Sequence, residues 1–385
     1  MKKITVLGAT GSVGTQALDV ARKEGYAVTA LSANRDVDSV EKYAREFNVK
    51  ACAMADEEAA KTLKYKLSDT DIKVYSGDKG IVEMINDTDF DTAVNSTLGM
   101  AGLMPSLAVA SKGKRLALAN KESMVIAGEI LNRVAKENRA EILPVDSEHC
   151  AIHQCLKAGE KKEVSRLILT ASGGPFFGKK ASEIKKMTLD DALAHPTWKM
   201  GAKITVDSAT LMNKGFEVIE ACRLFDVPHD KVDVVVHRQS IIHSMVEFCD
   251  NSVMAQLSVP DMRFCVQYAV NYPDRCEGVT EKLDFFNIPS LTFDKPDTEA
   301  FPLLAKAYHA VKVGGALPCV LNAANEIAVA AFLRKKISFA DISELVISAV
   351  DSLENDAKNA EKLEEILAFD SLGREHVRNI ISRAK

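Results

Sequence analysis

Two closely spaced carboxylates are the first residues whose types and spacing could do chemistry. Asp146 and Glu148 stand two positions apart in PVDSEH, directly after an apolar run that predicts a strand. In an extended chain, residues i and i+2 face the same side, so the carboxylates would repel each other unless a cation lay between them. Mg²⁺ or Mn²⁺ suits such a site, because both prefer oxygen ligands. Alternatively, Asp146 or Ser147 simply caps the helix that follows.

A second polar segment strengthens the interpretation as a metal site. VDSATLMNKGFEVIEAC, residues 206–222, predicts a helix from about Ser208. Asn213 and Lys214 precede Glu217 by four and three positions, so the three side chains can share one helix face. Glu217 would supply a third metal oxygen, while the amide and the ammonium would hold a phosphate or a sugar hydroxyl. The alternative is an exposed helix with an ordinary charge pair.

Two loop segments add groups that could hold a substrate. TASGGPF, residues 170–176, ends a predicted strand with Ser172 and two glycines, a pattern typical of an anion-binding turn. HPTWKMG, residues 195–201, is short, broken by proline and contains the only tryptophan, Trp198, beside His195. We expect this segment to close as a lid over the substrate or the nicotinamide. A tryptophan anchored in the core beside a structural turn is an equal alternative.

A glycine-rich turn near the N-terminus predicts a nucleotide site. Gly8, Gly11 and Gly14 lie in VLGATGSVG, between a predicted strand and a predicted helix. Glycines permit a tight turn and a close backbone approach, while the helix N-terminus attracts an anion. The spacing G-x-x-G-x-x-G departs from G-x-G-x-x-G, so a glycine turn without a nucleotide stays an alternative.

Residues at the ends of two later strands refine this prediction. After the strand TALSA come Asn34 and Arg35, where an NAD enzyme would place a carboxylate for the ribose 2′-hydroxyl. An arginine there favours the 2′-phosphate of NADPH, the alternative being a solvated loop charge. Lys121, in ANKES, also follows a strand and therefore belongs to the same ligand-binding edge.

The elements that must position these groups form an α/β fold. Residues 1–145 alternate short apolar runs with helical patterns, which predicts a Rossmann-like, doubly wound parallel sheet that binds NADPH. Residues 146–275 predict a catalytic, metal-binding and dimerisation α/β domain with a partly antiparallel sheet and the flap 195–201. Within it, VEFCDNSVMAQLS predicts a hairpin with a D-N-S turn. We read 276–297 as a linker and 298–385 as a helical C-terminal domain.

Composition excludes several other classes of protein. The chain has 385 residues and a formal charge of −5, which gives no reason to expect nucleic acid or an anionic membrane as a partner. No apolar run approaches the roughly 18 residues that span a bilayer, and the first residues leave no room for a signal peptide. Eight scattered cysteines without a C-x-x-C pair indicate reduced thiols in a cytoplasm-like compartment.

Taken in order, these motifs resemble one known family along essentially the whole chain. GATGSVG, ANKES, PVDSEH, TASGGPF, HPTWKMG, VDSATLMNKGFE and IIHSMVEF–MAQLSVPDMR resemble the 1-deoxy-D-xylulose 5-phosphate reductoisomerase family. The resemblance implies a homodimer that uses NADPH and a divalent cation (Mg²⁺, Mn²⁺ or Co²⁺). It also implies a reaction of the non-mevalonate isoprenoid pathway, in which a ketose phosphate is rearranged and then reduced to 2-C-methyl-D-erythritol 4-phosphate.

The resemblance also implies roles for individual residues. Those near the cofactor would be Thr10, Gly11, Ser12, Val13, Asn34, Arg35, Asn120, Glu122 and Gly201. The metal ligands would be Asp146, Glu148 and Glu217. Lys121 and Ser147 would bind the substrate backbone, and Lys121 and Glu148 would be candidates for proton handling. The phosphate end would be held by Ser172, His195, Ser208, Asn213 and Lys214, with Trp198 and Met200 in the flap.

Several positions differ from the family's usual pattern, and two rival functions stay open. Ala9, Thr197 and Phe216 replace a common serine, asparagine and leucine, and Cys150 and His153 also differ. None of these removes an implied metal ligand. One rival is an aspartate-semialdehyde-dehydrogenase-like enzyme, which would need a nucleophilic cysteine and no metal. The other is a non-catalytic module that senses NADPH.

Overall fold

The chain forms two compact units, each built from several separate segments. The computed structural model describes residues 1–198 and 200–383. The first unit comprises Met1–Ser123, Leu131–Cys150 and Asp261–Lys282, and the second comprises Met124–Ile130, Ala151–Pro260 and Leu283–Lys385. The two units are described separately below. The domain boundaries expected from the sequence stay a prediction, since the compact units interleave segments across them.

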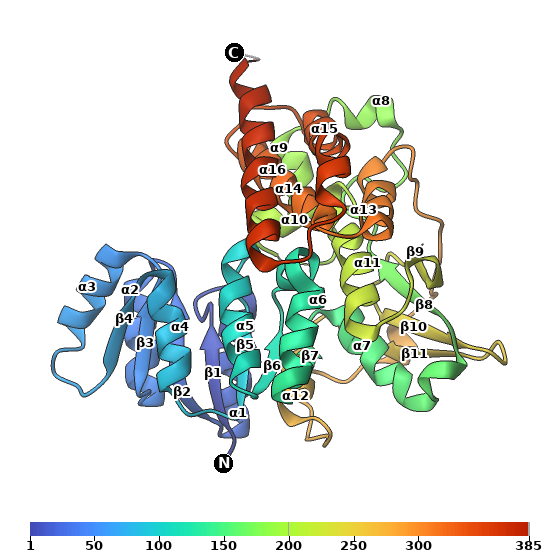
Figure 1. The fold of residues 1–385 in the computed structure, drawn as a ribbon. Coiled ribbons are helices and arrows are strands. Elements are labelled where there is room, and N and C mark those ends of the chain that lie inside the picture. Colours follow the sequence, from blue (N-terminus) through green and yellow to red (C-terminus); the bar gives the residue numbers. More distant parts are fainter. Residues whose placement is uncertain (199, 384–385) are drawn as a thin grey trace. The chain divides into compact units, whose positions relative to one another are not determined.

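The first unit is built on a seven-stranded parallel sheet of order β4-β3-β2-β1-β5-β6-β7 (Figure 1). Its strands are β1 Lys3–Leu7, β2 Ala27–Ala33, β3 Ala51–Met54, β4 Lys73–Ser76, β5 Thr92–Asn95, β6 Arg115–Leu118 and β7 Ile142–Pro144. The order reverses direction at β1, which has β2 on one side and β5 on the other. This is the switch point at which doubly wound sheets bind ligands. The predicted fold class is confirmed.

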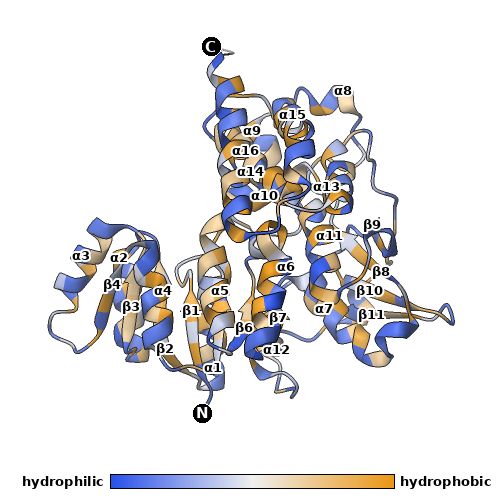
Figure 2. Cartoon of the chain, in the orientation of Figure 1, coloured by the Kyte–Doolittle hydropathy of each residue, from blue (hydrophilic) through white to orange (hydrophobic). Residues whose placement is uncertain are grey.

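Helices cover this sheet, and most of them are amphipathic. They are α1 Ser12–Glu24, α2 Val37–Phe47, α3 Glu57–Lys66, α4 Gly77–Asp87, α5 Leu103–Ser111 and α12 Arg263–Asn271. Two further helices, α6 Lys121–Asn138 and α7 Ser147–Cys155, contribute residues to both units. In α1 the buried residues recur with helical spacing at Ala17, Leu18 and Ala21, which explains why this stretch folds as a helix on the sheet. Figure 2 shows such helices striped with hydrophobic and hydrophilic residues.

Helix α12 belongs to the first unit although it follows the second sheet in the chain. Gln267 Nε2 donates to Glu24 Oε1 at 2.6 Å, tying α12 to the end of α1. The carbonyl oxygen of Val270 accepts hydrogen bonds from Lys2 Nζ at 3.1 Å and Arg115 Nη1 at 3.0 Å. The sequence analysis had placed this stretch with the catalytic segment. Its contacts with α1 and the strands are long-range and leave no local signal in the sequence.

The second unit contains a smaller mixed sheet of order β11-β10-β8-β9. Its strands are β8 Val164–Ala171, β9 Val232–Val236, β10 Ile242–Phe248 and β11 Val253–Leu257. Strands β8 and β9 are parallel, whereas β10 is antiparallel to both β8 and β11. The predicted hairpin forms, with Asn251 in its turn at φ 65°. The partly antiparallel sheet is therefore confirmed.

Helices complete the second unit. They are α8 Ala181–Ile184, α9 Leu189–Leu193, α10 Ala202–Ala209, α11 Met212–Phe225, α13 Pro302–Val313, α14 Leu317–Leu333, α15 Phe339–Ala357 and α16 Leu363–Arg383. The predicted helical C-terminal segment is confirmed, in orange to red in Figure 1, and α16 adds a fourth helix that the sequence patterns had not identified. Within the described ranges 1–198 and 200–383, no helix is long and apolar enough to cross a membrane.

Candidate active site

The glycine turn of the first unit leads from β1 into α1. Gly8 has φ +78°, and a Cβ there would lie 2.9 Å from the backbone of Ser96, so only glycine fits. Gly11 precedes the helix, and no side chain caps the first turn of α1. The backbone of the turn is held by the amides of Gly8 and Ala9, which both donate to Ser32 O. The turn thus presents a 13-residue helix N-terminus, where Thr10, Ser12 and Val13 also lie.

Arg35, the residue predicted to favour NADPH over NAD, lies just after the end of β2. Arg35 is 79% exposed at its side chain, and its Nε pairs with Asp56 Oδ2 at 2.8 Å. Asp36 caps α2 by accepting from the amide of Ser39 at 3.1 Å. The carboxylate that follows Asn34 and Arg35 is therefore engaged in holding a helix. An exposed guanidinium remains at the strand end.

Asn120 and Glu122 lie where β6 leads into α6. Asn120 accepts from the amide of Ser123 at 2.9 Å, and its Nδ2 donates to Thr97 O at 2.7 Å. The same nitrogen lies 3.2 Å from Glu122 Oε2. Both side chains are buried, so these contacts fix the loop beside the sheet edge. Their predicted proximity to a cofactor stays a prediction.

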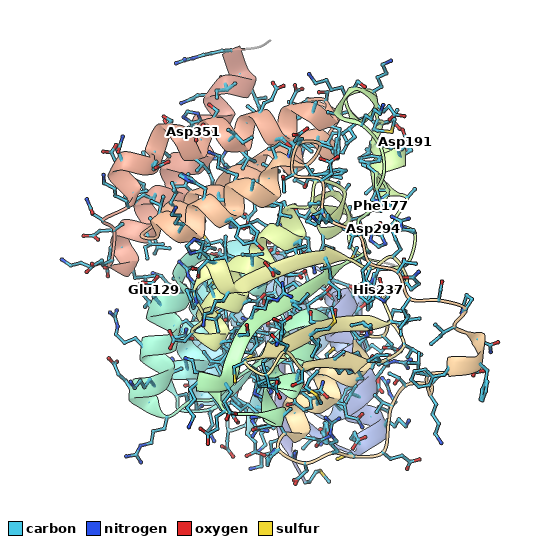
Figure 3. The ribbon with its side chains drawn as sticks, turned by 90° about the vertical axis from the view of Figure 1, so that its right-hand side faces the viewer. Glu129, Phe177, Asp191, His237, Asp294 and Asp351 are labelled. Carbon is cyan, nitrogen blue, oxygen red and sulfur yellow. The ribbon has the colours of Figure 1, made fainter. Side chains whose placement is uncertain are left out.

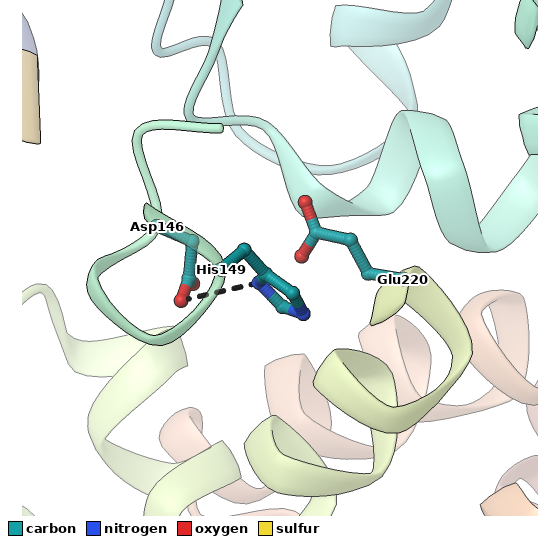
Figure 4. Close-up of side chains that lie close together, drawn as sticks. All are labelled: Asp146, His149 and Glu220. Carbon is teal, nitrogen blue, oxygen red and sulfur yellow. Dashed lines mark ion pairs between the residues drawn. The ribbon is translucent and has the colours of Figure 1, made fainter. Parts of the chain in front are cut away.

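Lys121 and Asp146 form a buried ion pair within the first unit. Asp146 also faces His149, whose Nδ1 lies 3.5 Å from its Oδ1 (Figure 4). Burial alone would raise the pKa of Asp146, but the Lys121 ammonium and the His149 side chain outweigh it and hold that pKa well below its usual range. Asp146 is therefore an ionised carboxylate with a cationic partner. Figure 4 also draws Glu220, which belongs to α11 of the second unit.

The backbone around Glu148 differs from the prediction. The segment is not extended, because α7 begins at Ser147 and places Glu148 in its first turn. The Glu148 amide donates to Asp146 Oδ1 at 3.3 Å, so Asp146 does cap the helix. Carboxylate oxygens of the two acids nevertheless lie within 4.8 Å of each other. Ser147 Oγ donates to Glu148 Oε2 at 2.6 Å.

The predicted polar face of the second unit lies on α11. The expectation of a single helix from Ser208 was wrong: α10 ends at Ala209, and Leu211 adopts φ +58° before α11 begins. Beyond the break, Glu217 is 1% exposed and accepts from Asn213 Nδ2 at 2.6 Å. Lys214 forms an ion pair with the same carboxylate. The three residues predicted to share a face are thus in direct contact.

Ser172, His195 and Gly174 meet at the end of β8. His195 Nδ1 accepts from the amides of Thr197 and Trp198, at 3.2 Å and 3.0 Å. Its proton therefore sits on Nε2, which donates to Ser172 Oγ at 3.0 Å. The Gly174 amide also donates to this hydroxyl, at 3.3 Å. With two donors already directed at Ser172 Oγ, the hydroxyl proton is free to meet an anion.

Burial, followed by the positive charge of Arg238, lowers the pKa of His195. This shift favours the neutral imidazole that the hydrogen bonds require.

The break between α10 and α11 packs against the same turn. Gly174 has φ +64°, and a Cβ there would lie 2.7 Å from Ser208 O. Ser208 therefore lies beside the Ser172 turn, as the substrate-binding prediction requires, although it belongs to α10. Trp198 faces the ring of His243, with 6.3 Å between ring centroids. Gly201 directly precedes α10, Met200 comes before it, and Lys199 of the predicted flap lies outside the described residues.

The sequence analysis missed Arg238, which contacts the Ser172 turn through its guanidinium. A signal was available, because Arg238 follows closely on β9, a strand parallel to β8, and the ends of neighbouring parallel strands share one edge of a sheet.

Fold and site together define a class of protein. A doubly wound sheet with a glycine turn, joined in one chain to a unit with a buried carboxylate and a second glycine turn, is typical of nucleotide-dependent enzymes acting on small molecules.

Comparison with known proteins narrows this class. Family models match residues 4–128 (1-deoxy-D-xylulose 5-phosphate reductoisomerase), 142–225 (the C-terminal domain of that enzyme) and 257–376 (DXP reductoisomerase C-terminal domain). The 1-deoxy-D-xylulose 5-phosphate reductoisomerase of Caldanaerobacter subterraneus is 51% identical over 98% of both chains. That of Acetivibrio thermocellus is 49% identical over 99% of this chain and 100% of its own. The chain belongs to the 1-deoxy-D-xylulose 5-phosphate reductoisomerase family.

Solved structures agree. A DOX-P reductoisomerase in complex with NADPH, fosmidomycin and magnesium aligns with a TM-score of 0.95 at 38% identity, over 99% of this chain and 98% of that one. The Zymomonas mobilis enzyme in complex with NADPH gives 0.91 at 41% identity, over 99% of both chains.

Proposed function

We propose that this chain converts 1-deoxy-D-xylulose 5-phosphate and NADPH to 2-C-methyl-D-erythritol 4-phosphate, a step of the non-mevalonate isoprenoid pathway. The observation that carries the proposal is a pair of buried carboxylates, each of which forms an ion pair with a lysine. Asp146 pairs with Lys121 in the first unit, and Glu217 pairs with Lys214 in the second. Burying four such charges costs free energy that a purely structural role does not require.

The donor set fits a divalent cation. Asp146, Glu148 and Glu217 offer carboxylate oxygens, the ligands that Mg²⁺, Mn²⁺ and Co²⁺ accept. We propose that these three hold the metal, as members of the family would. When bound, such a cation supplies Lewis-acid stabilisation of negative charge on substrate oxygens. Lys121 and Lys214 supply positive charge beside the carboxylates and would turn toward the substrate when the metal is present.

The chain's own groups would bind and shield the substrate. We propose that the Ser172 hydroxyl donates to the phosphate, while neutral His195 keeps that hydroxyl oriented. Ser208, Asn213 and Lys214 would bind the same end of the molecule, far from the bonds that change. Anchoring the phosphate positions the reacting carbons without taking part in the chemistry.

At the reacting end, Lys121 is the candidate proton carrier, and Ser147 would hold a substrate hydroxyl. Glu148 would either ligate the metal or accept a proton. Trp198 would exclude water when its segment closes.

The cofactor would be NADPH, which supplies the hydride. We propose that its phosphates lie at the N-terminus of α1, against Thr10, Gly11, Ser12 and Val13. Asn34 and Arg35 would bind the 2′-phosphate, and Asn120, Glu122 and Gly201 would lie near the remainder of the cofactor. The exposed guanidinium of Arg35 supports this assignment because it can leave Asp56 for a phosphate at little cost.

We also propose that the protein is a cytoplasmic homodimer. Strand β11 is an edge strand of its sheet, and Val253 and Met254 on it are 45% and 44% exposed. Phe285 and Phe286 of the same unit are exposed too. An apolar, unpaired edge favours association with a second copy. Light scattering should give twice the chain mass, and a Val253→Lys, Met254→Lys variant should give the monomer mass.

A metal-dependent NADPH oxidation assay tests the proposed function. With 1-deoxy-D-xylulose 5-phosphate, NADPH absorbance should fall only when Mg²⁺, Mn²⁺ or Co²⁺ is added. Glu217→Gln should lower turnover at least about a hundredfold while NADPH still binds. Glu129→Gln is the matched control, because Glu129 is 79% exposed. Full activity of Glu217→Gln at saturating metal would refute the three-carboxylate site.

The same assay separates the rivals. Loss of activity on blocking a cysteine, without a metal requirement, would favour the semialdehyde-dehydrogenase alternative. NADPH binding without any turnover would favour a sensing module.

A further inference from the structure

Arg238 follows β9, and its guanidinium reaches across to the turn after β8. Nη1 donates to the carbonyl oxygen of Ser172 at 3.3 Å and to that of Gly174 at 3.0 Å. The guanidinium carbon lies 4.8 Å from the centroid of the Phe177 ring, whose negative face attracts a cation. The side chain is thus fixed by two hydrogen bonds and an aromatic ring.

The backbone that carries this arginine is also fixed. The neighbouring residue, His237, is fully buried, and its Nε2 accepts from the amides of Ile241 and Ile242 at 3.3 Å and 3.2 Å. Its Nδ1 therefore carries the proton and donates to Thr292 O at 2.9 Å. The Phe293 ring stacks on the imidazole at 5.1 Å. Figure 3 labels His237, the residue directly before the arginine, and Phe177, whose ring the guanidinium contacts.

Peptide geometry determines the direction of the Gly173 amide in this turn. In a trans peptide the carbonyl and the following amide point in opposite directions. Because Ser172 O is directed at Arg238, the Gly173 amide points away from the arginine. In the part of the chain that the structure describes, this amide donates to no other residue. Gly173 has φ +77° and Gly174 φ +64°, left-handed conformations that glycine adopts readily.

We infer that Arg238 is a positioning residue for the phosphate of the substrate. It holds the Ser172–Gly174 turn so that the Ser172 hydroxyl and the Gly173 amide face the anion. Its permanent positive charge also lies behind that turn. The inference deepens the proposed function and rests on it for the identity of the sugar phosphate, although the same anion site would bind any phosphate monoester.

The charge of Arg238 also affects the pKa of His195. After burial, Arg238 is the second cause of the lowered pKa of His195, the group that donates to Ser172 Oγ. Removing the arginine charge while keeping the chain length should therefore raise the pKa of His195. A residue that merely packed against Phe177 would leave that titration unchanged.

Two variants test the inference by kinetics. Arg238→Met should raise KM for 1-deoxy-D-xylulose 5-phosphate about tenfold, as expected for losing a charge-assisted interaction, with the KM for NADPH within about twofold of wild type. Arg238→Lys should recover part of this loss because it keeps the charge but not the planar fork. Arg166→Met is the matched control. Its guanidinium pairs with Asp233 and Glu247 in the same sheet, without touching the turn.

Binding without turnover separates this inference from the proposed function. Inorganic phosphate is the probe. Because Trp198 is the only tryptophan in the chain, tryptophan fluorescence reports on its surroundings and should change as phosphate binds. The phosphate Kd should rise about tenfold in Arg238→Met but not in Arg166→Met. The pKa of His195, followed by NMR, should rise only in Arg238→Met.

Equal phosphate affinities in wild type and Arg238→Met, with an unchanged His195 titration, would overturn the inference even if the enzyme turned over its substrate normally. Conversely, Arg238-dependent phosphate binding without ketose phosphate turnover would uphold the inference and refute the proposed function.

Discussion

The molecule contains two glycine turns suited to anions, and they are built on different principles. Gly8–Gly14 opens the 13-residue helix α1, whose N-terminus supplies a fixed partial positive charge. Ser172–Gly174 leads into no comparable helix, since the next one, α8, has four residues. There the positive charge comes from the side chain of Arg238, and the donors that we infer for the anion are the Ser172 hydroxyl, held by His195, and the Gly173 amide.

This difference explains how much of each turn can be recognised from a sequence. A turn that works through its backbone needs only glycines at fixed spacing before a helix. A turn that works through side chains collects them from segments far apart in the chain. The first kind should be sensitive to glycine geometry alone, whereas the second should respond to both glycine and side-chain substitutions.

The largest effect should come from filling the first turn. A Cβ on Gly14 would collide with the carbonyl oxygen of Gly8, which is backbone and cannot move aside. Gly14→Ala should therefore weaken NADPH binding by about 1–3 kcal/mol, up to roughly a hundredfold in Kd. Titration of NADPH fluorescence measures this loss. An unchanged Kd would contradict the backbone-cradle account.

The matching change in the second turn should have a smaller effect. In Gly174→Ala the new Cβ would be strained by φ +64° and would contact the Ser208 carbonyl oxygen, which should destabilise this turn by about 1–2 kcal/mol. KM for 1-deoxy-D-xylulose 5-phosphate should rise roughly tenfold or more at saturating NADPH. Gly178→Ala is a useful control because Gly178 also has a positive φ, of +78°, but open space around its Cβ. If both variants behaved alike, backbone strain rather than the Ser208 contact would be the cause.

Arg35→Ala tests whether a side chain adds specificity to the first turn. We expect KM for NADPH to rise about tenfold and KM for NADH to stay nearly constant, because only NADPH carries the 2′-phosphate. Arg22→Ala is the control, since Arg22 forms surface ion pairs with Asp19 and Glu46. Equal changes for both cofactors would make Arg35 a bystander.

The smallest effect should be a pH dependence confined to the second turn. The pKa of His195 is lowered by burial and by Arg238, so folding favours its neutral form. The resulting stabilisation of the segment is complete above pH of about 6.5 and is lost as the pH falls toward the lowered pKa. Protonated Nδ1 can no longer accept from the Thr197 and Trp198 amides.

Trp198 emission should therefore change as the pH falls below about 6.5, and His195→Gln should abolish that transition. This variant separates His195 from His243, which lies near Trp198 and whose pKa burial lowers to about 4. A transition that persists in His195→Gln would assign the effect elsewhere.

Much of the fold could be predicted because it depends on local patterns. The parallel strands of the first unit, most of them buried, are short apolar runs separated by helical segments, as expected for residues 1–145. The hairpin around Asn251 also carried its own turn signal. By contrast, the left-handed conformation of Leu211 is imposed by packing and not by its residue type, so the break between α10 and α11 was missed.

The contacts of the candidate site also divide into local ones, which could be predicted, and long-range ones, which could not. Asn213, Lys214 and Glu217 contact one another because helical spacing brings them together. Of the two alternatives at Asp146, the helix cap is confirmed and the extended chain is not, because α7 begins one residue later. Arg238 was missed because its contact with Ser172 joins residues 66 positions apart in the chain. Such contacts arise only when β8 and β9 pair.

The most direct test of the two-turn account is the Kd of NADPH in four proteins: wild type, Gly14→Ala, Gly174→Ala and the double variant. If each turn serves its own ligand, Gly174→Ala should bind NADPH like wild type. The double variant should then match Gly14→Ala within about 0.5 kcal/mol. A Kd that rises in Gly174→Ala, and rises further in the double variant, would contradict the account.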